Sequence, residues 1–316
     1  MQDLLDLLSD GCFHSGEELG RVLGVTRAAI WKKLKKLDQM GIRLHSVKGK
    51  GYRLPEEIDL LSSSKLSASG LSIESQVHFS VASTNTEVTK FIQAGNSLPI
   101  LIATELQTDG RGRRGRQWQG GRVGKNILMS IGWHFDQGVN VVEGLSLAIG
   151  VAVARVLKQF GTERVGLKWP NDILVGDKKI CGILLEMVAD QDSCDVVIGI
   201  GLNLAMDNQQ MESVGQPWTD LASEIINLPE RNKLLALLAN EVKDVCLCFE
   251  RGDGLTSYLT EWLQHDALKN KPVQVVIGEK TALGIARGIN SSGALLLEKE
   301  GVLTAFNGGE VSVRQQ

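Results

Sequence analysis

The sequence lacks the long apolar runs and paired cysteines that would assign it to a membrane or to an oxidising compartment. No apolar run approaches the ~20 residues that span a bilayer. The N-terminal stretch MQDLLDLLSD is acidic, whereas a secretory signal would be basic. The five cysteines form no CxxC pair and accompany no His/Cys cluster, which predicts buried free thiols and no protein-built metal site. We therefore expect a cytoplasmic protein without a membrane partner.

The sequence also has little excess charge overall, but that charge is unevenly distributed. The formal net charge is −3. Residues 1–54 contain ten Lys or Arg against six Asp or Glu, so they carry +4 and the remainder carries −7. Between Arg27 and Arg53 nine basic residues accompany one acidic residue, Asp38. This asymmetry predicts an N-terminal module that faces a polyanion, and the length of 316 residues predicts two or three domains.

The first 60 residues have the pattern of a winged helix-turn-helix. A capping box that starts at Ser15 opens the first helix of the motif, and a tight turn follows at Gly24. Thr26 caps a second helix that has apolar residues on one face and lysines on the other. Residues 42–54 then predict a β-hairpin with a basic tip.

A solvated lysine face would by itself explain the second helix. The turn, the polar start of that helix and the basic hairpin tip together favour DNA binding, with the second helix in the major groove. We expect base contacts from the start of the helix and phosphate contacts from the lysines. The predicted DNA-binding residues are Thr26, Arg27, Trp31, Lys32, Lys33, Lys36, Lys48 and Lys50.

The most unusual stretch is GRGRRGRQW at Gly110–Trp118, where four arginines alternate with three glycines directly after the apolar run Ile100–Leu106. Glycines let the backbone approach a ligand closely, and guanidinium groups offer forked donors to carboxylates and phosphates. Two interpretations are open at this point. The loop either holds small anions, or it is a solvated basic turn or nucleic-acid patch, which is the commoner meaning of an isolated Arg/Gly loop.

Other polar clusters follow apolar segments in the centre of the chain. Ser83–Asn85 precedes a helix predicted at 87–93, and N-capping is a sufficient explanation for it. Glycines inside the run Val196–Leu204 predict a strand that a ligand or another backbone approaches closely. The whole centre predicts a mixed α/β domain. The expected strands are 78–81, 100–106, 126–135, 165–167, 173–175, 180–188 and 196–204, and the further expected helices are 142–160, 231–250 and 255–262.

Short alternating segments close the chain. Strands are predicted at 272–277, 280–289, 294–298 and 310–314, and turn signals at this spacing are typical of a small β-barrel. The serine-rich segment 55–69 predicts the boundary between the N-terminal module and the centre. Domains are expected at residues 1–60, 64–266 and 267–316.

Five motifs resemble those of biotin protein ligases. They are STN at Ser83–Asn85, GRGRRGRQW at Gly110–Trp118, KWPND at Lys168–Asp172, KKICGILLE at Lys178–Glu186 and GIGLN at Gly199–Asn203. Their order and spacing are similar to those of the family. With the winged helix in front and FNGGEVSVR behind, essentially the whole chain resembles the bacterial bifunctional biotin ligases and biotin-operon repressors. GRGRRGR together with KWPND is highly specific, whereas STN or GxGxN alone would be weak.

The resemblance implies an α+β multidomain fold with an N-terminal winged helix-turn-helix, a central mixed α/β ligase domain similar to class II synthetases, and a C-terminal SH3-like barrel. It implies that biotin and ATP give biotinoyl-5′-adenylate and pyrophosphate, and that biotin then passes to a lysine of a biotin carboxyl carrier protein. Mg²⁺ is expected with the nucleotide, held mainly by phosphates and water. Repression of biotin biosynthesis is implied through operator DNA bound by a homodimer that the adenylate promotes.

The resemblance also implies roles for individual residues. An anionic carboxylate must attack an anionic phosphate, so cations are needed where the two meet. The implied catalytic residues are Arg113, Lys179 and Asp172, with Asp172 helping to deprotonate the carrier lysine. The implied biotin-binding residues are Ser83, Thr84, Asn85, Gln107, Arg111, Gly112, Arg113 and Lys179. The implied nucleotide-binding residues are Trp118, Lys168, Asn171, Asp172, Asn203 and Arg314.

The segment Gly110–Lys125 is the candidate lid over the water-sensitive adenylate. Its second half, Gln119–Lys125, departs from the Ser-Pro-x-Gly-like turn of many family members, and we expect its mobility to differ. Three alternatives stay open, namely a ligase whose winged helix no longer regulates, a lipoate ligase, and a regulator without enzyme activity. GRGRRGR and KWPND argue against the second, and the presence of Arg113 and Lys179 argues against the third.

Overall fold

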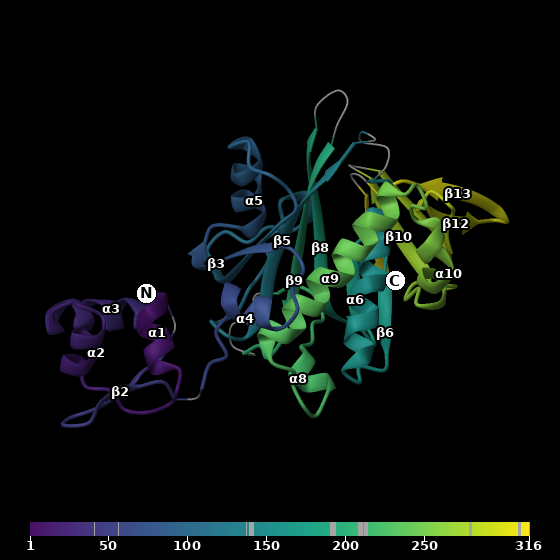
Figure 1. The fold of residues 1–316 in the computed structure, drawn as a ribbon. Coiled ribbons are helices and arrows are strands. Elements are labelled where there is room, and N and C mark those ends of the chain that lie inside the picture. The colour runs from purple at the N-terminus through teal and green to yellow at the C-terminus, as the bar shows by residue number, and fades with distance from the viewer. Residues whose placement is uncertain are drawn as a thin grey trace.

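A small N-terminal domain stands beside a larger body that contains two β-sheets (Figure 1). The computed structural model describes residues 1–40, 42–55, 57–136, 138, 142–189, 194–207, 211, 214–277, 280–308 and 311–315, without the side chains of Gln2, Gln39, Ala189, Val311, Ser312, Arg314 and Gln315. Within these residues, no helix has the length and apolar character needed to cross a membrane.

The N-terminal domain is a helix-turn-helix followed by a two-stranded wing, as predicted. The side chains of Ser15 and Thr26 cap their helices by accepting backbone N–H bonds. Gly51 of the wing has a φ of 106°, and a Cβ there would lie 2.0 Å from the carbonyl oxygen of His14. Only glycine fits this position. The elements are α1 (Gln2–Leu8), α2 (Gly16–Val22), α3 (Arg27–Gln39), β1 (His45–Val47) and β2 (Gly51–Arg53).

The central domain is built on a seven-stranded mixed sheet with the order β3-β4-β5-β9-β8-β7-β6. Its parallel pair, β3 and β4, is connected through α5, and the other neighbours run antiparallel. The elements are α4 (Ser63–Ala68), β3 (Glu74–Val81), α5 (Thr84–Gln93), β4 (Ile100–Gln107), a 3₁₀ turn (Arg113–Gly115), β5 (Asn126–Phe135), α6 (Leu145–Gln159), β6 (Val165–Lys168), β7 (Asp172–Val175), β8 (Lys178–Ala189), β9 (Cys194–Asn203), α8 (Leu221–Glu224), α9 (Arg231–Glu250) and α10 (Thr256–Gln264).

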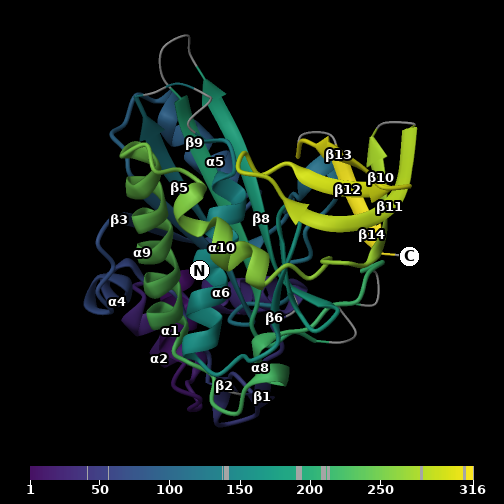
Figure 2. The same cartoon turned by 90° about the vertical axis from the view of Figure 1, so that its right-hand side faces the viewer.

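The two faces of the central sheet bury different clusters. Along β4, Leu101 and Ala103 belong to the main core with α6 and α9, whereas Ile100 and Ile102 pack with Val88 of α5. Neighbouring side chains of a strand point to opposite faces, so α5 lies on the face opposite α6 and α9. Figure 2 shows α6, α9 and α10 together in front of the sheet. The α5 face is therefore the one that the long helices leave accessible.

Some boundaries differ from the prediction. Helix α5 begins at Thr84 and not at Glu87, so Thr84 and Asn85 lie in its first turn. Helix α6 begins at Leu145, three residues after the predicted start. Helix α4, inside the predicted boundary segment, was not predicted and buries Leu66 against α9. A short amphipathic helix beside serines produces too little periodicity to be detected from sequence.

The C-terminal segment forms a five-stranded antiparallel sheet with the order β13-β12-β11-β10-β14. Its buried side chains, including Val273 and Leu295, join the main core of the central domain. Trp169 Nε1 also donates a 3.0 Å hydrogen bond to the carbonyl oxygen of Gly293, so the sheet packs tightly on the KWPND segment. Strand β13 was not predicted, and Glu310, the predicted start of the last strand, lies outside the described residues. The strands are β10 (Pro272–Ile277), β11 (Lys280–Ile289), β12 (Leu295–Lys299), β13 (Val302–Phe306) and β14 (Val311–Gln315).

Candidate active site and DNA-binding surface

A cavity of about 1170 Å³ opens on the α5 face of the central sheet. Glycines of adjacent strands form its floor, with Gly182 of β8 opposite Gly201 of β9. A Cβ at Gly201 would lie 2.4 Å from Trp118 Cε2, and one at Gly199 would lie 2.2 Å from Asn85 Oδ1. The missing side chains create the room for the cavity, which is the close approach that the glycine-interrupted strand predicted.

The cavity collects the predicted ligase residues from segments that lie far apart in the sequence. Arg314 lies in β14, but its side chain is outside those described. The predicted residues that line the cavity are Ser83, Thr84, Asn85, Gln107, Arg111, Gly112, Arg113, Trp118, Lys168, Asn171, Asp172, Lys179 and Asn203.

One end of the cavity is polar and uncharged. Ser83 occupies the N-cap position of α5, yet in the described structure its side chain makes no capping hydrogen bond. N-capping therefore does not explain the STN motif. Gln107 Oε1 accepts bonds from the backbone N of Thr84 at 2.8 Å and from its Oγ1 at 3.1 Å. Ser83, Thr84 and Gln107 together line this end of the cavity.

Asn85 is held by two partners behind the cavity wall. Its Oδ1 accepts a 2.6 Å bond from Ser130 Oγ, and its Nδ2 donates a 2.7 Å bond to Glu186 Oε2. Asn85 and Ser130 are buried. The same Glu186 oxygen lies 3.4 Å from Arg111 Nη2. Asn85 thus holds the cavity wall in place, and Glu186 links Asn85 to Arg111 of the Arg/Gly loop.

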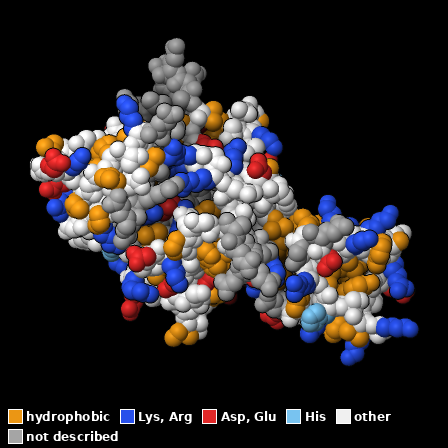
Figure 3. All heavy atoms as spheres, turned by 180° about the vertical axis from the view of Figure 1, so that it is seen from behind, with side chains coloured by type: hydrophobic (Ala, Val, Ile, Leu, Met, Phe, Trp, Pro, Cys, Tyr) orange, Lys and Arg blue, Asp and Glu red, His pale blue; other side chains and the backbone are white. Residues whose placement is uncertain are grey.

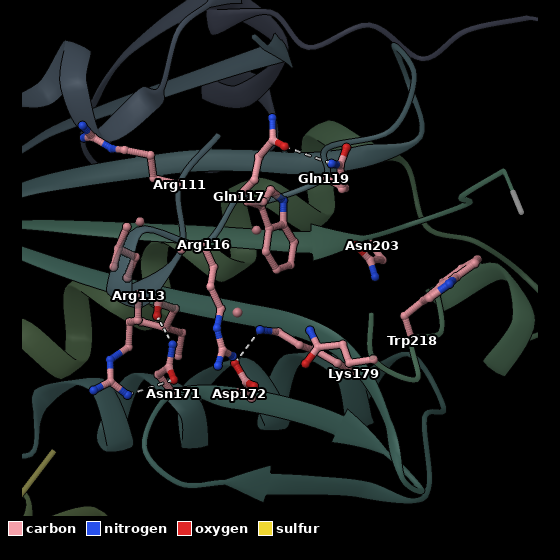
Figure 4. A pocket seen from close by; sticks show the side chains of 18 of the residues that line it. Arg111, Arg113, Arg116, Gln117, Gln119, Asn171, Asp172, Lys179, Asn203 and Trp218 are labelled. Atoms are coloured by element: carbon pink, nitrogen blue, oxygen red, sulfur yellow. Dashed lines mark hydrogen bonds and ion pairs between the residues drawn. The ribbon is translucent and has the colours of Figure 1, made fainter. Parts of the chain in front are cut away.

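The other end of the cavity is cationic. Lys179 Nζ lies 2.5 Å from Asp172 Oδ1, and both side chains are largely buried. Arg113 Nη1 donates a 3.4 Å bond to Asn171 Oδ1, and Arg113 Nη2 donates to the carbonyl oxygen of Gly308. Figure 4 shows Arg113 and Asn171 close to the Lys179–Asp172 pair. This end can neutralise anionic groups within a mostly water-excluded space.

The Arg/Gly loop folds as a narrow hairpin over the cavity. Arg111 and Gln117 form a backbone bridge, and Trp118 N donates a 2.8 Å bond to the carbonyl oxygen of Gly110. A Cβ at Gly110 would lie 2.7 Å from the carbonyl oxygen of Trp118, so this glycine allows the hairpin to close. Figure 4 shows Arg111 pointing away from the cationic end and Arg116 pointing towards it.

Trp118 extends from this hairpin into the cavity. Its indole packs over Gly182 and Gly201, and the Lys179 ammonium lies 5.3 Å from the ring centroid. Its Nε1 is buried and has no hydrogen-bond partner in the part of the chain that is described. The indole therefore lies on the same glycine floor that a ligand in the cavity would contact.

The sequence reasoning missed several residues of this region. Ser130 sits inside an apolar strand, and Glu186, although inside the KKICGILLE motif, received no role. Arg116 lines the cavity but was not assigned. Trp218 also lines it, because residues 217–219 pair with the backbone of Lys179. Such contacts come from tertiary pairing and leave no local pattern.

The cysteines are free, as predicted, but Cys12 is exposed, whereas all five were expected to be buried. Cys181 lies beside Lys179 on β8. Burial raises the pKa of its thiol to about 12, although the nearby Lys179 charge acts in the opposite direction. A thiol in this state is a poor nucleophile. The described residues also contain no cluster of three or more His, Cys, Asp or Glu side chains suited to a metal ion.

The predicted DNA-binding residues gather on α3 and the wing. Lys33 is half-buried, and the other seven are exposed. Trp31 is 54% exposed, and the Lys35 ammonium lies 5.3 Å from its ring centroid. Figure 3 shows Lys and Arg side chains projecting from this domain, at the lower right. Basic side chains around an exposed helix suit the phosphate backbone of a duplex.

Comparison with known proteins gives matches along most of the chain. Family models match at residues 1–53 (HTH domain), 78–203 (Biotin/lipoate A/B protein ligase family) and 270–314 (Biotin protein ligase C terminal domain). The bifunctional ligase/repressor BirA of Escherichia coli (strain K12) is 41% identical over 312 residues, covering 98% of this chain and 96% of that protein. BirA of Bacillus subtilis (strain 168) is 32% identical over 324 residues, covering 97% and 96%. A solved structure, the biotin protein ligase from Aquifex aeolicus in complex with biotin and ATP, shares the fold, with a TM-score of 0.66 and 22% identity over 77% of this chain and 99% of that one.

Proposed function

The chain belongs to the bifunctional ligase/repressor family, and from this membership we propose how its own residues perform the family reaction. The protein is an ATP-dependent biotin–protein ligase. It converts biotin and ATP into biotinoyl-5′-adenylate and passes biotin to a lysine of a biotin carboxyl carrier protein. Its helix-turn-helix domain binds DNA and makes it a repressor of biotin biosynthesis as well.

The observation that supports our assignment of the site is the division of one cavity into an uncharged polar end and a cationic end. We place the neutral ureido ring of biotin at the uncharged end, among Ser83, Thr84 and Gln107. Asn85 is buried and held by two partners, so it acts there by holding the wall. The valeryl carboxylate then extends over the glycine floor towards Lys179.

At the cationic end the biotin carboxylate meets the α-phosphate of ATP. A carboxylate oxygen attacks phosphorus and pyrophosphate leaves, while Arg113 and Lys179 offset the negative charge that gathers there. Lys179 exchanges its 2.5 Å contact with Asp172 for one with the reacting anions. We assign the nucleotide to Trp118, Lys168, Asn171, Asp172, Asn203 and Arg314, and further contacts to biotin to Arg111 and Gly112.

In the second step the carrier lysine attacks the acyl carbon of the adenylate, an amide bond forms and AMP leaves. Asp172, released from Lys179, accepts the proton that the attacking amine loses. The carrier lysine therefore needs no separate base.

Magnesium fits this site only as a companion of the nucleotide. No metal-holding cluster of carboxylate, His or Cys side chains occurs in the described parts of the chain. Hard cations of this kind prefer oxygen ligands and keep several waters. We therefore expect phosphate oxygens and water to hold the ion.

We also propose that the adenylate promotes a homodimer. On one side of β8, strand β7 pairs with residues 178–182, and beyond them the described residues provide no strand on that side. Met187, which pairs with β9 but has no strand on its other side among the described residues, is 55% exposed. An open strand edge with an apolar side chain is suited to pairing with a second copy. Sedimentation velocity should show dimers with biotin and ATP, and Met187→Lys should weaken them; an unchanged monomer would contradict this.

We infer an SH3-like barrel at residues 267–316, supported by its five antiparallel strands, and a class II synthetase-like ligase domain at residues 64–266. The winged helix-turn-helix domain takes residues 1–60. A cytoplasmic location is supported by five cysteines that are all unpaired.

The assignment of Arg113 is tested by pyrophosphate release. Arg113→Ala should abolish biotin-dependent release, because its guanidinium reaches Asn171 at the cationic end, and should leave the protein folded. Arg251→Ala is the matched control, since Arg251 is a surface residue after α9 that pairs loosely with Asp253 at 3.7 Å. Normal release by Arg113→Ala would remove the assignment. Exchange assays with lipoate in place of biotin should give no signal.

A further inference from the structure

A fully buried ion pair lies outside the cavity and has no part in the reaction described above. Arg231, the first residue of α9, is 3% exposed, and Glu105 of β4 is 0% exposed. Arg231 Nη2 lies 3.0 Å from Glu105 Oε2. Buried charges persist only when their remaining hydrogen-bonding positions are also satisfied. The further partners of Glu105 therefore identify what the pair holds together.

Both oxygens of Glu105 accept backbone hydrogen bonds from segments that are distant in sequence. Oε1 accepts a 2.7 Å bond from Leu61 N, in the linker that follows the winged helix. Oε2 accepts a 3.1 Å bond from Gly124 N, at the end of the candidate lid. One carboxylate therefore binds two segments at the same time. The first is the linker, residues 58–62, which joins the DNA-binding domain to the central domain. The second is the candidate lid Gly110–Lys125, here called the ligand loop.

The linker is held on its other side by the start of α9. Asp59 Oδ2 accepts a 2.7 Å bond from the backbone N of Arg231, and Asp59 Oδ1 accepts a 3.1 Å bond from Asn232 Nδ2. Asn232 Oδ1 in turn accepts a 3.1 Å bond from Ser62 N. Residues 59–62 therefore form a defined strap against the central domain.

Apolar packing joins the same two segments. Gly124 has a φ of 79°, and a Cβ there would lie 2.6 Å from Cγ2 of Ile58 in the linker. Val123 is 3% exposed and belongs to the same buried cluster as Leu60 and the leucines of the winged helix. The end of the lid thus packs directly on the linker and on the core of the DNA-binding domain.

We propose that Glu105 is a positioning residue that couples the ligand loop to the linker of the winged helix. When the loop orders around biotin and the adenylate, the Gly124 bond to Glu105 tightens and stabilises the Leu61 bond. By reciprocity, loosening the linker weakens binding in the cavity. The ligand part of this statement rests on the proposed function, whereas the link between Leu61 and Gly124 does not.

Glu105→Gln tests the carboxylate itself. An amide offers one acceptor oxygen where the carboxylate offers two, so the substituted side chain cannot accept from both Leu61 N and Gly124 N. Hydrogen exchange on the full-length protein should rise at both amides by on the order of tenfold or more, because one amide loses its acceptor and the other is left with a weaker bond to a neutral oxygen. The KM for biotin in ATP–pyrophosphate exchange should rise by about tenfold, with kcat changed much less.

Asp59→Ala perturbs the strap without touching Glu105 or the cavity, and it tests the coupling if Glu105→Gln fails to fold. We expect faster exchange at Gly124, although Asp59 makes no contact with it, and a severalfold rise in the KM for biotin. Asn240→Ala is the matched control. Asn240 also joins α9 to a backbone segment, through a 2.8 Å bond to the carbonyl oxygen of Gly70, but that segment lies away from the loop. This variant should leave the KM and the exchange of Gly124 unchanged.

A folded Asp59→Ala protein with the wild-type KM for biotin and wild-type hydrogen exchange at Gly124 would overturn the inference. A Glu105→Gln protein in which exchange rises at Leu61 alone would overturn it too. Failure of the proposed function looks different. In that case the wild-type protein would show no biotin-dependent exchange, while the joint response of Leu61 and Gly124 to the variants would still report the coupling.

Discussion

Replacing Gly199 with alanine tests whether the glycine floor and the Asn85 wall form one unit. A Cβ at this position would lie 2.2 Å from Asn85 Oδ1 and 3.0 Å from its Cγ, so Asn85 has to move. Moving it breaks the 2.6 Å bond from Ser130 and the 2.7 Å bond to Glu186. One of these bonds is neutral and the other involves a partly exposed carboxylate, so their joint loss is about 2 kcal/mol.

That energy corresponds to a rise of about 30-fold in the KM for biotin, since about 1.4 kcal/mol changes an equilibrium constant tenfold. ATP–pyrophosphate exchange over a range of biotin concentrations measures it. Gly150→Ala in α6 is the matched control. Its Cβ would meet only Leu167 Cδ2, at an ordinary 3.5 Å, and Ile183 Cδ1, at 4.0 Å, and alanine in a helix should raise stability by about 0.5–1 kcal/mol without changing the KM. A folded Gly199→Ala protein with the normal KM would refute our interpretation of the wall.

Other consequences of the structure can be measured directly. Gly51→Ala should distort the wing and lower affinity for DNA from the biotin-operon promoter by on the order of tenfold in gel shifts, with pyrophosphate exchange retained; unchanged affinity would contradict the wing's role. Maleimide at neutral pH should label the exposed Cys12 and spare Cys181, whose thiol pKa is raised to about 12 by burial, so mass spectrometry should find one adduct on an active enzyme. The pKa of His134 is raised, chiefly by its hydrogen bond to Asp195, so its stabilising charge is fully present below pH 6.5 and is lost as pH rises through the folded pKa. The Tm advantage over His134→Gln should therefore shrink with rising pH, and a constant difference would argue against it.

Local sequence signals predicted most of the elements. Strands β5 and β10 and helix α9 have the predicted bounds, because each is an apolar or periodic run with polar, glycine or proline residues at its ends. Strand β13 was missed, since its five residues are mostly exposed and show no alternation. The parallel pairing of β3 with β4 could not be predicted from local sequence pattern either, because it depends on where α5 packs.

In the candidate site too, local sequence patterns predicted some residues, whereas others depend on tertiary contacts. Arginines, glycines and a tryptophan concentrated in one loop are a strong local signal, and the structure places them around a single cavity with Lys179 and Asp172. Ser130 and Glu186 act through partners more than 40 residues away, as their separations of 45 and 101 residues from Asn85 indicate. Glu105 did leave a signal, because an acidic residue within the apolar run 100–106 requires a buried partner. The identity of that partner, Arg231, could come only from the fold.

The strap at residues 59–62 also has a consequence for the order of synthesis on the ribosome. Its hydrogen bonds to Arg231 and Asn232 span 172 and 170 residues, so they form only after most of the chain has emerged. The helices of the winged domain, which lie within the first 40 residues, are complete long before that. During synthesis the folded DNA-binding domain is thus attached to the rest of the chain without a defined orientation. Its orientation relative to the central domain becomes fixed only when α9 has emerged.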